Sequence, residues 1–155
     1  MAHIPVNHPL RPLYRTIAGL VGAYVLFFGI VGVVRTWGDP LFERGPVWVL
    51  GLRTNLAFAL MSIVFGLVIL IGSVLGRNFS HYLNLGIGIL FMAAAIGMMA
   101  VMQTDLNFLN FSMSTVIVSM IFGLIFLATG LYDKVGSPED AHAEKAYRSQ
   151  PSSRG

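Results

Sequence analysis

The sequence contains no cysteine, and this absence excludes disulfide bonds, thiolate catalysis, and zinc or iron–sulfur sites built from cysteine ligands. Charge is also scarce, because Asp, Glu, Lys and Arg make up only 11% of the 155 residues. A soluble globular domain carries about 25% charged residues. Apolar residues reach 55% and the mean hydropathy is +0.74, which is too hydrophobic for a disordered chain. We therefore expect a small polytopic membrane protein.

Four long apolar segments contain no ionisable side chain. A bilayer core about 30 Å thick needs about 20 helical residues, and each segment is close to that length. The segments lack the alternation of a membrane β-barrel and the one-sided periodicity of a surface helix. The sequence therefore predicts an all-α, integral membrane four-helix bundle. The expected spans are residues 16–34, 56–75, 82–102 and 113–132.

The polar segments predict the domain limits and the orientation. Residues 1–15 are rich in proline and are expected to form a tail that is extended until Pro12, which is well placed as a first helical residue. Residues 16–135 are expected to form the transmembrane domain, and residues 136–155 a polar, partly disordered tail. Residues 76–81 are expected to form a tight turn in which Ser80 caps the third span. Seven of the ten Lys and Arg residues lie on one side: two in the first tail, one in this turn and four after the fourth span. Because basic residues accumulate on the cytoplasmic side, both termini are expected to be cytoplasmic.

The sequence offers no recognisable catalytic centre. Intramembrane ionisable groups, which proton and ion pathways need, are missing from the predicted spans. His81, at the edge of the third span, is expected to be solvated or to cap the helix. Metal-ligand spacings, Ser–His–Asp arrangements and glycine-rich phosphate loops are not found. We therefore expect no enzyme activity, no metal and no cofactor, and the low basic content argues against nucleic acid as a partner.

Small residues recur at close-packing spacing within the spans. Helices in lipid associate where small residues four positions apart let their backbones approach. Such pairs either pack the four helices together or face a partner protein; Ala93 with Gly97 is one of them. The candidate helix-packing residues are Ser62, Gly66, Gly72, Gly76, Ser119 and Gly123.

A weak internal repeat links the second and fourth spans. Residues 62–73 match residues 119–130 at five of twelve positions, an offset of 57. Leu26-Phe27 likewise corresponds to Leu90-Phe91 at an offset of 64. The pattern suggests a duplicated helical hairpin with two parallel repeats.

Polar residues gather in the two links that are expected to be external. Val47–Leu50 is too apolar to float in water and is expected either to lie against the interface or to cap the outer helix ends. Arg53 and Asp105 are expected to pair, directly or through a neighbouring amide, tying the second span to the third and fourth. The polar residues of these two links are interpreted mainly as contacts that hold the links together, and only secondarily as a ligand site. The members of this external polar cluster are Arg53, Thr54, Asn55, Asp105, Asn107 and Asn110.

Three runs of sequence carry a family resemblance. Ile4–Arg15, Trp48–Asn55 and Met102–Leu109 together resemble an actinobacterial family of small four-helix membrane proteins that is defined only as a domain of unknown function. The resemblance extends from residue 4 to about residue 136. It implies a multi-pass protein of the plasma (inner) membrane, and it implies no activity or ligand.

Two functions compete on these grounds. The first is a non-catalytic accessory or scaffold subunit of a larger membrane complex, with the lipid bilayer and other integral membrane proteins as partners. The alternative is a stand-alone carrier or sensor of a small or lipidic ligand of unknown identity, bound at the external polar cluster. The featureless spans and the small-residue grooves favour the first.

Overall fold

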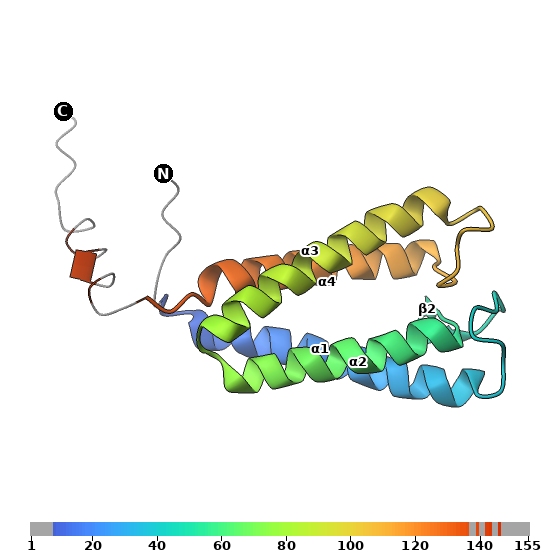
Figure 1. Cartoon of the computed structure of the whole chain (residues 1–155), viewed down its shortest axis with the longest axis horizontal. Helices are drawn as coiled ribbons and strands as arrows, with labels where there is room; N and C mark the ends of the chain where they lie inside the picture. Colours follow the sequence, from blue (N-terminus) through green and yellow to red (C-terminus); the bar gives the residue numbers. More distant parts are fainter. Residues whose placement is uncertain (1–7, 137–138, 140–141, 144–145, 147–155) are drawn as a thin grey trace.

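A computed structural model describes residues 8–136, 139, 142, 143 and 146, and four long helices make up most of it (Figure 1). Helix α1 spans Arg11–Thr36, α2 Leu56–Leu75, α3 Arg77–Val101 and α4 Met113–Tyr132. All four are long and apolar enough to cross a membrane. The predicted all-α four-helix membrane fold is therefore confirmed.

Two helices begin earlier than the apolar segments suggest. Helix α1 begins at Arg11, five residues before the predicted span and one residue before Pro12, the predicted first helical residue. Helix α3 begins at Arg77 instead of residue 82, and the turn predicted at 76–81 shrinks to Gly76, whose φ of 62° suits glycine. Ser80 consequently lies buried within α3 and accepts a hydrogen bond from Asn84, so it is not a cap. Most of the predicted tail at 136–155 lies outside the described residues.

The four helices form two antiparallel pairs. Helix α1 packs along α2, and α3 packs along α4, while the contacts between the pairs are sparser. Figure 1 shows the α1–α2 pair beside the α3–α4 pair, with the first and last described segments at the same end. We call this end the terminal end, and the opposite end, which carries the links, the loop end.

Equivalent glycines bring the helices together within each pair. A β-carbon placed on each of these glycines would lie close to a backbone nitrogen of the facing helix. The distances are 3.4 Å from Gly22 to Leu70, 2.5 Å from Gly66 to Leu26, 2.8 Å from Gly88 to Leu127, and 3.1 Å from Gly123 to Met92. Gly66 and Gly123 differ by 57 positions, the offset of the predicted repeat. Gly22 and Gly88 differ by 66 positions, two more than the offset read from Leu26 and Leu90. Glycines at corresponding positions therefore bring the helices together in both pairs.

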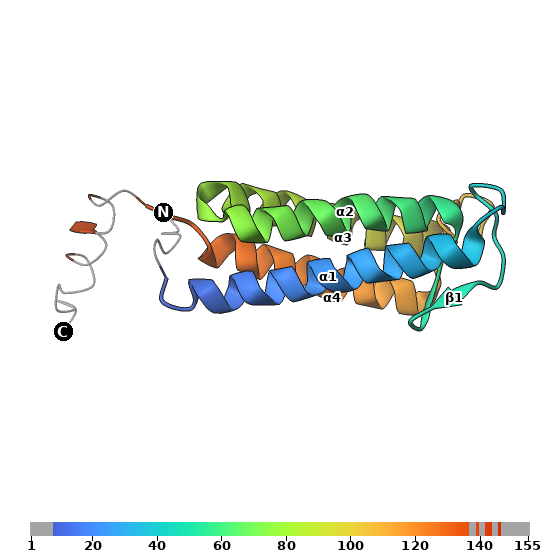
Figure 2. The ribbon, with the colours of Figure 1, turned by 90° about the horizontal axis from the view of Figure 1, so that it is seen from below.

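A short β-hairpin covers the loop end, where the sequence predicted no strand (Figure 2). Strand β1, Trp48–Val49, pairs antiparallel with β2, Leu52–Arg53. The two turn residues between them, Leu50 and Gly51, both have positive φ, as the common two-residue hairpin turn requires. Val49 and Leu52 are buried against Phe28 of α1. Val49 and Leu52 therefore cap the helix ends at the loop end, which is one of the two predicted alternatives for this apolar segment.

Candidate functional site

The two links at the loop end are joined by asparagine side chains. Asn110 is 1% exposed, and its Nδ2 donates to the carbonyl oxygens of Gly45, at 2.9 Å, and Thr54, at 2.8 Å. Asn55 is the N-cap of α2: its Oδ1 accepts from the Phe58 backbone N–H, and its Nδ2 donates to the Phe108 carbonyl oxygen at 2.7 Å. These bonds satisfy backbone groups that would otherwise be buried without partners.

Asn107 organises the second link from within. Its Nδ2 donates to the carbonyl oxygens of Met102 and Phe111, and its Oδ1 accepts from the Phe111 backbone N–H at 2.8 Å. Thr54, which is 1% exposed, donates its backbone N–H to the Val47 carbonyl oxygen. The amide side chains of the cluster are thus engaged with backbone, so the cluster forms a structural cap, which we call the polar cap.

The predicted ion pair between Arg53 and Asp105 is wrong, because Arg44 is the residue that pairs with Asp105. Asp105 accepts from Arg44 Nη2 at 2.8 Å, and the Asp105 side chain is 99% exposed. Arg53 instead donates from Nη2 to the Gly45 carbonyl oxygen at 3.3 Å. The β-hairpin explains the difference, because it turns Arg53 back toward the first link and leaves Arg44 to reach across to the second.

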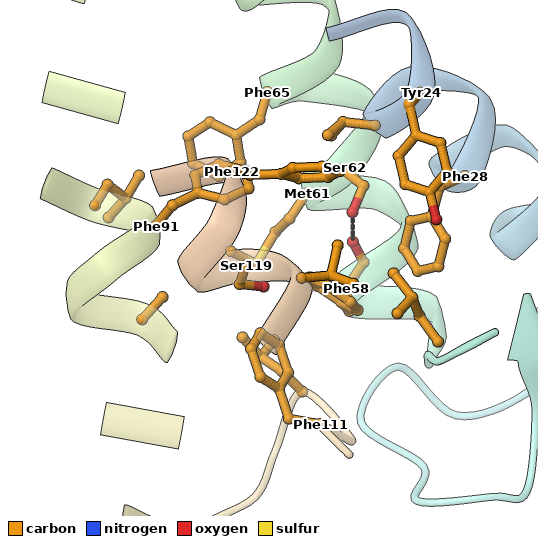
Figure 3. Close-up of a pocket in the computed structure, with 16 residues that line it drawn as sticks. Tyr24, Phe28, Phe58, Met61, Ser62, Phe65, Phe91, Phe111, Ser119 and Phe122 are labelled. Carbon is orange, nitrogen blue, oxygen red and sulfur yellow. Dashed lines mark hydrogen bonds between the residues drawn. The ribbon is translucent and has the colours of Figure 1, made fainter. Parts of the chain in front are cut away.

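Beside the polar cap, an apolar cavity of about 100 Å³ lies between the two helix pairs (Figure 3). Leu52, Leu109 and Phe111 of the loop end contribute to its wall. Aromatic rings from all four helices form most of the rest, and these are Tyr24, Phe28, Phe58, Phe65, Phe91 and Phe122. The cavity was not foreseen from the sequence, because each of these rings looks like an ordinary lipid-facing or core residue.

Polar groups contribute little to this cavity. Ser62 lines it, but its hydroxyl already donates to the Phe58 carbonyl oxygen at 2.8 Å. Met61 on α2 and Leu90 on α3 also line the cavity and are 42% and 43% exposed, so side chains that reach the surface form part of its wall. A dry apolar cavity of about 150 Å³ is enough to bind benzene in a soluble protein. The arrangement is therefore suited to a small apolar group.

The sequence-predicted packing residues have three different environments. Gly66 and Gly123 lie at the close approaches within the two pairs, and Gly72 meets the Leu83 side chain of α3. Ser62 and Ser119 are buried and line the cavity. Gly76 is the turn between α2 and α3, and it faces the Arg15 guanidinium group instead of a helix.

Ionisable side chains at the terminal end lie deeper than predicted. Asp133, which is fully buried, accepts from Arg11 Nε at 2.6 Å. His81 is 4% exposed, and its Nδ1 lies 2.6 Å from the Gly130 carbonyl oxygen. His81 is therefore not solvated, and the capping alternative is confirmed, because Gly130 is one of the last residues of α4, whose carbonyl oxygens have no partner within the helix. The early start of α3 is the reason for the burial, because it puts His81 within the helix, on the side that packs against α4.

A family model described as "Domain of unknown function (DUF4383)" matches residues 15–132. The match runs from the first turns of α1 to the end of α4 and so includes the polar cap and the cavity. No characterised protein and no solved structure matches the chain. Because the family model covers well over half of the sequence, this multi-pass, four-helix membrane protein belongs to the DUF4383 family.

Proposed function

We propose that this protein binds a small apolar ligand, such as the end of a lipid acyl chain, in the cavity between its helix pairs, and acts as a carrier or sensor. The observation that carries the proposal is an aromatic-lined cavity between the two helix pairs. Apolar pockets with few polar groups are the usual form of small-ligand sites. The ligand site lies in the cavity and not at the external polar cluster, whose amides are already hydrogen-bonded.

Adjacent alanines on α3 provide a matched test. Ala94 lines the cavity, whereas Ala93 is exposed on the outer face. Leucine at position 94 adds three carbon atoms to a space of about 100 Å³, so Ala94→Leu should fill the cavity. Ala93→Leu adds the same atoms outside the bundle.

The probe is palmitic acid with a photoreactive diazirine at the end of its chain, added to the purified full chain. We expect peptides containing Met61 and Leu90 to be labelled in the original protein and in Ala93→Leu, and labelling to fall at least fivefold in Ala94→Leu. Equal labelling in the two variants, or labels found only on the outer helix faces, would refute the ligand site. Circular dichroism and gel filtration establish that both variants are folded.

A second candidate, the accessory or scaffold subunit, is favoured by small residues that face away from the bundle. A β-carbon on Gly86 or Gly97 of α3 would meet nothing within 4 Å, and Ala93 and Ala100 are exposed. These positions share one side of the helix because their spacing follows the helical period. Such a face supports close approach by a helix of another integral membrane protein.

The two candidates are separable with the same variants. Purification in mild detergent should recover a partner with the original protein and with Ala94→Leu. A bulky side chain in Ala93→Leu or Gly97→Leu should remove that partner while leaving photolabelling of the cavity unchanged. A protein that purifies alone, or a partner retained by Gly97→Leu, would refute the accessory role.

Location and chemistry complete the proposal. The excess of basic residues in the termini and the 76–81 segment supports cytoplasmic termini, and the family resemblance supports an actinobacterial plasma membrane. We propose a non-catalytic role because the cavity wall supplies only hydroxyl groups as polar side chains, with no acid–base pair beside them.

A further inference from the structure

A second concave site lies at the terminal end, separate from the cavity. A groove of about 440 Å³ runs between the first turns of α1 and the last turns of α2. Arg11 and Arg15 line it on one side, and Leu70, Ser73 and Val74 line it on the other. The groove and the cavity share no lining residue, so the groove can be considered independently of the proposed function.

The groove carries uncompensated positive charge. Arg11 is balanced by Asp133, but Arg15 has no carboxylate partner among the described residues. Arg15 Nη2 donates to the carbonyl oxygens of Ser73 and Val74, where it interacts favourably with the C-terminal end of α2. Its Nε is buried without a hydrogen-bond partner. None of the described residues that line the groove is acidic, so its charge suits an anion.

The position of the groove matches the headgroup region of a bilayer. Helix α2 has 20 residues, and at 1.5 Å per residue it is about as long as the hydrocarbon core is thick. Its last turn therefore lies where phosphate groups meet acyl chains. Val74 is 80% exposed and Leu70 is half-buried, so an apolar wall continues from the arginines along the lipid-facing side.

We infer that this groove binds the headgroup of an anionic phospholipid. The guanidinium groups of Arg11 and Arg15 would hold the phosphate, which arginine recognises well because its planar N–H groups match the geometry of phosphate oxygens. The wall formed by Leu70 and Val74 would contact the acyl chains. This apolar wall favours a lipid over free phosphate, which would gain nothing from it.

Two exposed valines allow a test that leaves buried contacts intact. Val74 is 80% exposed at the groove, and Val34, near the other end of α1, is 73% exposed. Val74→Glu places a negative charge beside Arg15, whereas Val34→Glu makes the same change far from the groove. The probes are dioctanoyl phosphatidylglycerol, dioctanoyl phosphatidylcholine and inorganic phosphate, each titrated into the purified full chain and measured by native mass spectrometry.

We expect the original protein and Val34→Glu to bind phosphatidylglycerol about tenfold more tightly than phosphatidylcholine, and Val74→Glu to lose that preference. Arg15→Lys should retain part of it, because the charge remains without the planar fork. Equal affinity for the two lipids, or an equal loss in both valine variants, would overturn the inference. Saturable binding of inorganic phosphate with the affinity of phosphatidylglycerol would also overturn it, by showing a site for the free ion.

Discussion

Asn110 is the residue whose replacement should most damage the polar cap. It is 1% exposed, donates to carbonyl oxygens of two separate segments, and has a φ of 56°. Asparagine tolerates this left-handed conformation better than most residues do. The side chain therefore contributes both to the hydrogen bonding of the cap and to the backbone path of the second link.

The expected loss follows from these two roles. Asn110→Ala removes two hydrogen bonds that each contribute about 1 kcal/mol, and it leaves the Gly45 and Thr54 carbonyl oxygens without this donor. The strain of alanine in the left-handed region adds about 1 kcal/mol. We expect the free energy of unfolding to fall by about 3 kcal/mol in Asn110→Ala, and by about 2 kcal/mol in Asn110→Gly, where the strain is absent.

Reversible unfolding in detergent would measure these differences. The chain has two tryptophans, Trp37 and Trp48, and both lie in the first link, so their fluorescence reports on the loop end. Asp105→Ala is the control, because it breaks only an exposed ion pair and should hardly move the unfolding midpoint. A smaller loss in Asn110→Ala than in Asp105→Ala, or a larger loss with glycine than with alanine, would refute the reasoning.

Three further predictions concern packing, orientation and the terminal end. Gly123→Leu should lower the yield and melting temperature far more than Gly97→Leu, because only the first faces a neighbouring backbone; an equal effect would contradict the packing described. Reporter fusions should give an external signal at residue 45 and a cytoplasmic one at residue 150, and the reverse would contradict cytoplasmic termini. Arg11→Ala should cost about 3 kcal/mol by leaving its buried carboxylate partner unpaired, and neutralising that carboxylate as well should recover part of the melting temperature.

The transmembrane helices could be predicted because the bilayer imposes a minimum apolar length. The ends of the helices could not be predicted in this way. An apolar segment ends at the first charged side chain, but the backbone continues as a helix beyond it. Arg11 and Arg15 illustrate the point: both belong to α1, where their apolar stems lie along the helix and their charged groups bind partners at its end. Counting only uncharged residues therefore shortened α1 and α3.

The polar composition of the two links predicted that they lie together. It did not predict which side chains of one link pair with which of the other. Arg44 and Arg53 lie in the same link, and nothing in the sequence shows which of them pairs with Asp105. The β-hairpin holds Arg53 in a strand, and Arg44 forms the pair. The cavity left no signal in the sequence, because it depends on how one hairpin sits against the other. The repeat at an offset of 57 was the useful clue, since it indicated that α2 and α4 play equivalent roles.

Side-chain size distinguishes the contacts within the helix pairs from those between them. Within a pair, glycines let the backbones meet, although rings such as Phe28 and Phe58 also touch there, whereas rings make several of the contacts between the pairs. Tyr24 of α1 meets Phe122 of α4 with centroids 5.5 Å apart, and Phe65 of α2 meets Phe91 of α3 at 6.3 Å. These four rings line the cavity between the pairs (Figure 3). A ligand in the proposed site would therefore contact these rings and lie away from the glycine contacts within each hairpin.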